Sequence, residues 1–309
     1  MYKSDSPIQI PSQDLLRRND FALGLAKSLI SYNDKASLSV GLLGPWGSGK
    51  TSLVNLIIDD IEKESQGMPD DSQPIILRFN PWNFASSDQL LHQFFLMLAD
   101  QFSGKKDEAL GKIGDALKKY GSEFDAFNPF VTLLKYGTAI GQAASAISNT
   151  SKATGDVLKS LSLHGTTDLS AQRKKIIDLL DNQKRKVIIT IDNIDRLNNT
   201  EIQLIFKLVA SVANFPNTIF LLSFDKDIVV SALNNYQGDD GNKYLEKIIQ
   251  VVVNIPPVSK SQLRDVFDNY FDPLKSQLLR FFENVPSCYK TLMYHNHLVF
   301  SSDISLRTF

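Results

Sequence analysis

The residues best suited to chemistry form a glycine-rich loop, GPWGSGKT, from Gly44 to Thr51. It fits the pattern G-x-x-x-x-G-K-[ST], in which glycines let consecutive backbone N–H groups converge on phosphate oxygens. In such loops the lysine, here Lys50, reaches the β- and γ-phosphates, and the hydroxyl of Thr51 ligates Mg²⁺. We also expect the Lys50 side chain to be exposed. The expected nucleotide contacts are Gly44, Pro45, Trp46, Gly47, Ser48, Gly49, Lys50, Thr51 and Ser52.

A second set of polar residues follows the apolar run VIITI at residues 187–191. Asp192 comes directly after this run, where a magnesium-binding aspartate belongs in a nucleotide site. Ligands of parallel α/β sheets lie beyond the carboxyl ends of the strands. We therefore expect Lys50, Thr51 and Asp192 to meet there, with Thr51 and Asp192 sharing the magnesium ion.

The next residue, Asn193, is an amide where nucleotide-hydrolysing sites usually carry a carboxylate. Its oxygen can hold a water molecule, but it cannot take a proton at neutral pH. A positioned general base typically contributes ~10²–10⁴-fold to the rate. Two alternatives follow: Asp195 acts as the base, or hydrolysis is slow and the protein stays mostly ATP-bound. We favour slow hydrolysis.

Five apolar runs must position these side chains. They comprise residues 38–43, 75–79, 187–191, 218–223 and 251–255. Helical patterns separate them, which indicates an α/β fold with a parallel sheet covered on both faces. The glycine-rich loop follows the first run, before a helix that starts at Thr51. The segment FDKD at residues 224–227 has phenylalanine where a guanine-reading motif has asparagine, so we expect ATP rather than GTP.

The texture of the chain divides it into four regions. We expect residues 1–102 and 184–258 to form the two halves of the nucleotide-binding core. Residues 103–183 are expected to be a helical insertion, and residues 259–309 the start of a helical C-terminal region. Residues 127–146 are apolar, but Lys135 interrupts them, so we expect no membrane span, and a contact with the membrane surface is the lesser alternative. We expect the natural chain to continue past Phe309. A resemblance to NTPases that begin a lid helix at this point makes Arg307 a candidate γ-phosphate sensor.

Composition excludes several function classes. The 33 basic and 34 acidic residues give a net charge of -1, which argues against a sequence-independent grip on nucleic acid. The single cysteine, Cys288, excludes an intramolecular disulfide and a thiolate metal cluster. The first residues lack the apolar core of a secretory signal, so a cytoplasmic location is expected.

Together with the glycine-rich loop, four further segments resemble the KAP family of P-loop NTPases. They are RFNPWNF at 78–84, IDNIDRL at 191–197, SFDKDIV at 223–229 and YLEKIIQ at 244–250. The resemblance covers about residues 12–258 and implies an additional-strand P-loop fold, with the fourth strand between the first and third. It matches Asp195 and Arg196 to the family's second acid and arginine, and Asp225 to a γ-phosphate sensor. Trp46 and Trp82 make the match specific, and we interpret both as packing residues.

The resemblance also implies a function. Bacterial members of the family include phage-exclusion proteins and components of phage-defence operons. By this resemblance, the chain is expected to be an ATP-dependent switch or motor in a bacterial defence complex, with ATP and Mg²⁺ as cofactors. Its protein partners would come from the same operon, and self-association is possible. The alternatives are an ATP-binding scaffold without hydrolysis and a membrane-associated signalling NTPase that uses residues 103–183.

Overall fold

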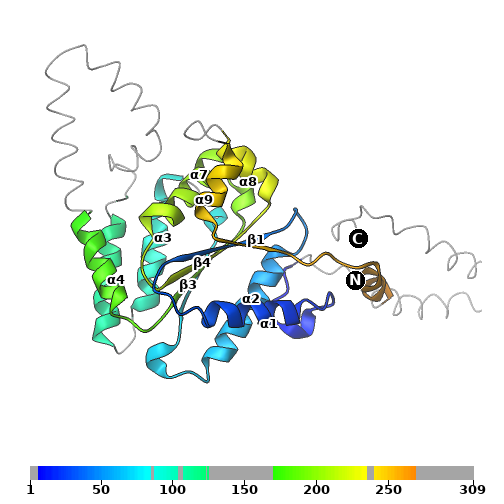
Figure 1. Cartoon of the computed structure of the whole chain (residues 1–309), viewed down its shortest axis with the longest axis horizontal. Coiled ribbons are helices and arrows are strands. Elements are labelled where there is room, and N and C mark those ends of the chain that lie inside the picture. The colour runs from blue at the N-terminus through cyan, green and yellow to red at the C-terminus, as the bar shows by residue number, and fades with distance from the viewer. Residues whose placement is uncertain are drawn as a thin grey trace, which may run out of the picture.

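The computed structural model describes residues 6–84, 87–103, 107–122, 124, 170–234 and 240–268. A five-stranded parallel sheet with the order β2-β3-β4-β1-β5 lies between helices (Figure 1). The strands are β1 (Leu38–Leu43), β2 (Ile75–Phe79), β3 (Val187–Ile191), β4 (Thr218–Phe224) and β5 (Val251–Asn254). The predicted five-stranded parallel sheet, with the fourth strand between the first and third, is confirmed.

The central strands are mostly apolar because both faces of the sheet are covered. Every residue of β3 and β4 is buried. β5 lies at one edge of the sheet, where Val251 and Val252 are 42% and 57% exposed. In the register of the central pair, Ile191 lies beside Leu222, so the next residues, Asp192 directly after β3 and Ser223 within β4, lie side by side.

Two helices, α1 (Asn19–Ile30) and α2 (Lys50–Ser65), cover one face of the sheet. They pack on alternate residues of the strands, among them Val40, Ile188 and Leu221. α2 begins within the glycine-rich motif, at Lys50, one residue earlier than the sequence pattern predicts.

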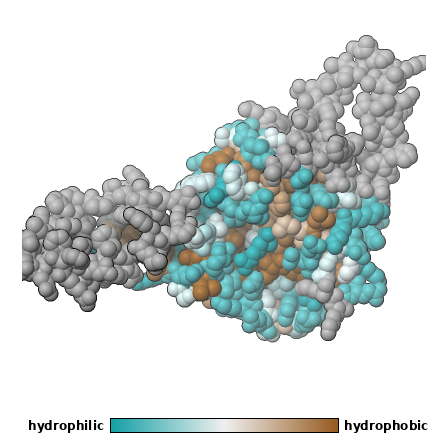
Figure 2. Space-filling view, turned by 180° about the vertical axis from the view of Figure 1, so that it is seen from behind, coloured by the Kyte–Doolittle hydropathy of each residue, from teal (hydrophilic) through white to brown (hydrophobic). Residues whose placement is uncertain are grey.

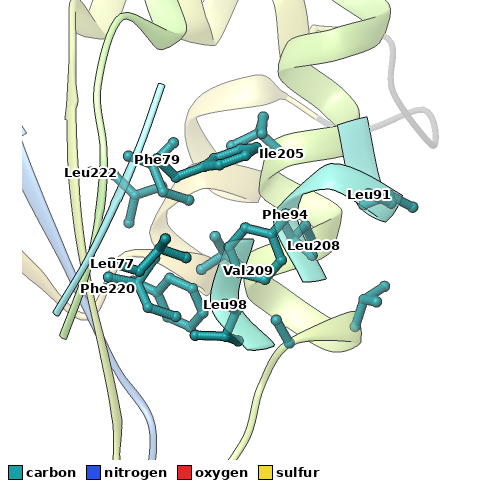
Figure 3. Packing of buried hydrophobic residues seen from close by; sticks show 14 of the residues in the cluster. Leu77, Phe79, Leu91, Phe94, Leu98, Ile205, Leu208, Val209, Phe220 and Leu222 are labelled. Carbon is teal, nitrogen blue, oxygen red and sulfur yellow. The ribbon is translucent and has the colours of Figure 1, made fainter. Parts of the chain in front are cut away.

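The other face carries a larger cluster, rich in phenylalanine (Figure 3). Phe79 of β2 meets Phe94 edge to face, with ring centroids 5.2 Å apart. The helices that contribute to this cluster are α3 (Ser87–Phe102), α4 (Glu108–Ser122), α7 (Asn199–Lys207), the π-helix η5 (Leu208–Val212), α8 (Lys226–Leu233) and α9 (Gly241–Ile248). Short 3₁₀ turns are η1 (Pro11–Gln13), η2 (Asp70–Ser72), η3 (Pro81–Asn83) and η4 (Ile194–Arg196).

The described parts of the predicted insertion are helical and pack on the core. α4 and the helical residues 170–181 place Leu117, Ile176 and Leu180 in the cluster that contains Phe94. Residues 127–146, Arg307 and Phe309 lie outside the described residues. Within the described ranges, no helix is both long and apolar enough to cross a bilayer. The face in Figure 2 mixes hydrophilic and hydrophobic residues.

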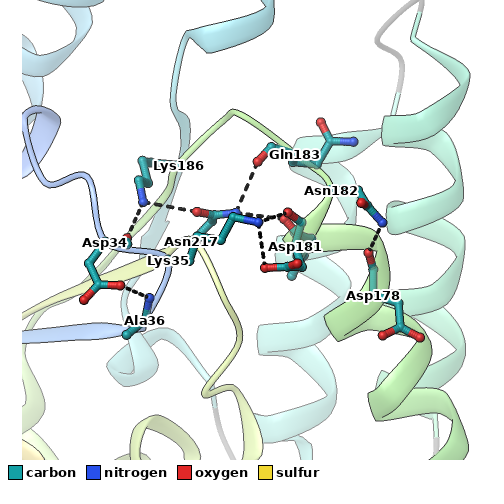
Figure 4. A network of polar contacts seen from close by, with 10 residues as sticks. Asp34, Lys35, Ala36, Asp178, Asp181, Asn182, Gln183, Lys186 and Asn217 are labelled. Carbon is teal, nitrogen blue, oxygen red and sulfur yellow. Dashed lines mark hydrogen bonds and ion pairs between the residues drawn. The ribbon is translucent and has the colours of Figure 1, made fainter.

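A buried asparagine ties three segments together at the amino edge of the sheet (Figure 4). Asn217 precedes β4 with a φ of 59°, and only 4% of it is exposed. Its amide nitrogen donates to the carbonyl oxygens of Leu180 at 2.9 Å and Gln183 at 3.2 Å. Its oxygen accepts a hydrogen bond from Lys186 Nζ at 3.1 Å. Burial lowers the pKa of Lys186, while the charge of nearby Asp34 raises it. Asn217 thus joins the end of helix 170–181 to the central strands.

Asn217→Ala should lower the free energy of unfolding by about 2–5 kcal/mol, because it removes the side-chain hydrogen bonds of a buried residue and forces alanine into a left-handed conformation. Asn217→Gly loses the same hydrogen bonds but accepts the positive φ, so it should be about 1 kcal/mol less damaging. Urea unfolding followed by circular dichroism measures both values. Equal destabilisation by the two variants would contradict a contribution from the backbone conformation.

Candidate functional site

The glycine-rich loop connects β1 to α2 at the carboxyl edge of the sheet. Gly47 and Gly49 have φ angles of 79° and 87°, a left-handed region that side chains disfavour. The Trp46 amide donates to the Asp225 carboxylate at 3.1 Å, which holds the loop against the end of β4. The first N–H groups of α2 have no partners within the helix and point out of its N-terminus, where an anion is favoured.

Lys50 is the best-connected polar side chain of the loop. Its ammonium lies 2.9 Å from the carboxylate of Asp195, which belongs to η4. It also donates to the carbonyl oxygens of Gly44 at 3.0 Å and Pro45 at 3.2 Å. The side chains of Lys50 and Asp195 are 9% and 3% exposed, so two opposite charges meet almost out of contact with solvent.

The expectation that Lys50 is exposed is wrong. The loop curls over the ammonium, and a buried ammonium needs a counter-charge, which Asp195 provides. The same contact brings the loop after β1 to the loop after β3, although β4 lies between these strands. The two polar segments that the sequence singles out therefore form one cluster.

Asp192 stands directly after β3, in the same loop as Asp195, and is 9% exposed. One carboxylate oxygen accepts a hydrogen bond from the hydroxyl of Ser223 on β4. The other oxygen lies 3.5 Å from the side-chain amide nitrogen of Asn193. Asn193 has a φ of 60°, a conformation that asparagine tolerates better than most residues. The orientation of the Asp192 carboxylate is thus set by its two neighbours.

An arginine and two tryptophans lie at the rim of the site. The guanidinium of Arg196 lies over the Trp46 ring, 5.0 Å from its centroid, within the range of a cation–π contact. Trp46 and Trp82 are 42% and 54% exposed, so both lie at the surface. η4 therefore contacts the glycine-rich loop twice, through Asp195 with Lys50 and through Arg196 with Trp46.

The remaining predicted contacts have different surroundings. Asp225 caps α8 by accepting from the Asp227 amide, and its second oxygen accepts from Trp46, so both oxygens bind backbone. Thr51 is the second residue of α2 and is partly buried. The hydroxyl of Ser52 accepts a hydrogen bond from the Ile8 amide at 3.3 Å, which directs it toward the N-terminal segment.

Two residues of the site escaped the sequence reasoning. Strand order could have indicated Ser223, since it follows Leu222, the β4 partner of Ile191, just as Asp192 follows Ile191. Arg18 carries no such signal. It is 7% exposed and donates to the Ser48 carbonyl inside the glycine-rich loop at 2.5 Å.

This chain is similar in sequence to a phage-exclusion protein. A relative in Escherichia coli (strain K12), the Phage T7 exclusion protein, is 27% identical in an alignment 290 residues long that covers 89% of this chain. The chain spans 37% of the length of that relative.

Two solved structures from Aeropyrum pernix are also similar. The ORC1 protein in complex with DNA is 12% identical, with a TM-score of 0.41 over 87% of this chain and 51% of its own. The ORC2 protein (ADPNP-ADP complexes) is 11% identical, with a TM-score of 0.43 over 87% of this chain and 55% of its own. A family model described as the KAP family P-loop domain matches residues 18–307. Because this match covers most of the sequence, the chain belongs to the KAP family of P-loop NTPases.

Proposed function

We propose that this chain binds ATP with Mg²⁺, hydrolyses it slowly, and uses the bound nucleotide as a switch in phage exclusion. The observation that carries the proposal is the meeting of Lys50 with Asp195, next to Asp192, at the N-terminus of α2. A lysine, a helix N-terminus and two buried carboxylates at one sheet edge suit a phosphate chain with a bound cation.

The oxygen donors present fit magnesium. Thr51 supplies a hydroxyl and Asp192 a carboxylate, both hard ligands of the kind that Mg²⁺ prefers. Among the residues that the structure describes, no three acidic, histidine or cysteine side chains cluster as a metal cage. Magnesium needs none, because it keeps several waters and binds the nucleotide phosphates. When bound, the ion would neutralise charge on the β- and γ-phosphates.

The base preference rests on β4. Phe224, which stands where a guanine-reading motif has asparagine, is fully buried and packs on Phe206 with ring centroids 5.5 Å apart. A side chain in this position faces the core and cannot read a base edge. This favours ATP over GTP.

Asp195 competes with the nucleotide for Lys50. The ammonium that is expected to reach the phosphates is bound by three protein oxygens, of which only that of Asp195 carries charge. Phosphate oxygens can replace the carboxylate, because they too supply negative charge. ATP binding would therefore release Asp195 and η4 from the loop, and this is the conformational change of the proposed switch.

Slow hydrolysis rests on Asn193. Its side chain lies beside Asp192, where a base would act, but an amide cannot accept the proton of the attacking water. Asp195 is the alternative base, because release from Lys50 would leave a free carboxylate near the γ-phosphate. Phosphoryl transfer depends more on positioning and charge than on a base, so slow turnover remains chemically reasonable with Asn193.

The biological part of the proposal is a role in phage exclusion with protein partners from the same operon. Its support is the similarity to the Phage T7 exclusion protein. A scaffold that binds ATP without hydrolysis is the rival, and a steady-state ATPase assay separates the two. Partners that recognise the switch should be retained in a pull-down with ATP and lost with ADP.

Asp195→Asn should tighten ATP binding, because a neutral amide competes less well for Lys50. If the competition costs 1.4 kcal/mol of binding free energy, the Kd for ATP should fall about tenfold. Lys50→Ala should abolish binding. Titration calorimetry with Mg²⁺-ATP measures both.

The double variant Lys50→Ala with Asp195→Asn removes both buried charges, so it controls for the instability of a lone Asp195 and should still fail to bind. Lys63→Ala, at an exposed position of α2, should bind ATP normally. Weaker binding by a folded Asp195→Asn protein would refute the competition.

Asn193→Asp should raise steady-state ATP turnover by roughly 10²-fold, the low end of the effect of a general base, with little change in affinity. Aspartate tolerates the left-handed backbone of this position, so the fold should be retained. Asn193→Gly also accepts the conformation but supplies no base, so it should not accelerate hydrolysis. If Asn193→Asp leaves a fast wild-type rate unchanged and Asp195→Asn abolishes it, Asp195 is the base.

A further inference from the structure

We propose that Arg18 is a positioning residue that couples the glycine-rich loop to residues 256–268, so that ATP binding and the order of the C-terminal segment depend on each other. This inference rests on the proposed ATP binding and adds the part of the chain that responds to it. Its basis is a set of contacts around residues 14–18, between η1 and α1.

Arg18 bridges two segments that are remote in sequence. One guanidinium nitrogen donates to the Ser48 carbonyl in the loop at 2.5 Å, and the other donates to the Pro256 carbonyl after β5 at 2.8 Å. The same nitrogen that binds Ser48 lies at 3.0 Å from where a Cβ on Gly49 would stand, so the arginine fills the space against the loop. A guanidinium can span two acceptors in fixed directions, whereas a lysine ammonium is a single point of charge.

The turn before Arg18 is built to direct it inward. Arg17 has a φ of 52°, which is uncommon for a residue other than glycine. The Asp14 carboxylate accepts hydrogen bonds from the backbone amides of Arg18 and Asn19 at 2.5 and 2.8 Å, so Asp14 caps the start of α1. Burial lowers the pKa of Arg18, and the charge of Asp14 acts in the opposite direction.

The segment after β5 runs past the loop and returns to this turn (Figure 1). Ile255 continues the sheet by donating to the Leu43 carbonyl at 2.9 Å, next to Gly44. Residues 260–268 are helical. This helix contacts the turn through Gln262, which donates to the Leu16 carbonyl at 2.5 Å, and through an exposed ion pair between Asp265 and Arg17 at 2.9 Å.

These contacts form a path from the phosphate site to the C-terminal helix. A phosphate held by the loop backbone fixes the peptide at Ser48, whose carbonyl holds Arg18. Arg18 in turn holds Pro256 and the turn on which helix 260–268 rests. Linkage is reciprocal, so ordering of residues 256–268 should also strengthen ATP binding.

Amide hydrogen exchange with and without saturating Mg²⁺-ATP tests the coupling. In the wild type, ATP should slow exchange in residues 256–268 by about fivefold or more, the lower end of ordinary coupling energies. Arg18→Lys keeps the charge but cannot span both carbonyls. It should bind ATP about tenfold more weakly, as expected for one lost hydrogen bond to a charged group. At saturating ATP it should show no protection of residues 256–268.

Arg185→Lys is the matched control. Arg185 is 5% exposed and donates to the Gln73 carbonyl at 3.1 Å. It lies before the amino end of β3, whereas the glycine-rich loop lies at the carboxyl ends of the strands. This variant should lose stability yet keep the full effect of ATP on residues 256–268. Gln262→Met leaves Arg18 in place, so it should bind ATP but lose the protection of residues 260–268. If Arg18→Lys does not fold, this second variant tests the coupling.

Wild-type protection by ATP that persists in Arg18→Lys and Gln262→Met would overturn the coupling alone. Unchanged exchange in a wild type that binds ATP would also overturn it. A wild type that does not bind ATP would instead overturn the proposed function, and the coupling with it.

Discussion

The buried ion pair between Lys50 and Asp195 is the contact on which the rest of the site depends. It joins the loops that follow β1 and β3, which are not neighbours in the sheet. Breaking such a pair from one side typically costs 3–5 kcal/mol, because it leaves an uncompensated buried charge. Lys50 is therefore held until another anion replaces Asp195. A nucleotide phosphate chain can do so, which makes this ion pair the natural point of control.

The strand between the two loops supplies their support. β4 contributes Ser223, which orients Asp192. Asp225, the first residue after β4, accepts a hydrogen bond from the Trp46 amide. Parallel strands that end at one edge present such side chains together without strain. Arg18 supports the loop from the opposite side, so the loop is held by the sheet edge and by the N-terminal turn. A change in the contacts of Lys50 can therefore alter the position of η4 and of the segment after β5.

The predictability of these features follows the range of the interactions behind them. Strand positions and the loop could be predicted because local hydrophobic runs and glycine spacing encode them, and the resemblance supplied the strand order. The burial of Lys50 could not, since it depends on Asp195, which is distant in the chain and carries no pairing signal. The exposure of Trp46 and Trp82 could not be predicted, because a tryptophan in a motif can pack in the core or at the surface. Arg18 was missed because its partners are backbone carbonyls, which no side-chain pattern reveals.

The central claim is that Lys50 leaves Asp195 for the nucleotide. The most direct test is a structure determined experimentally with Mg²⁺ and a non-hydrolysable ATP analogue. We expect the Lys50 ammonium to lie at about 3 Å from a β- or γ-phosphate oxygen, with Asp195 no longer in contact and Mg²⁺ bound at Thr51 and Asp192. The account would be contradicted if the analogue is bound while Lys50 is still paired to Asp195 and Asp192 does not contact the metal.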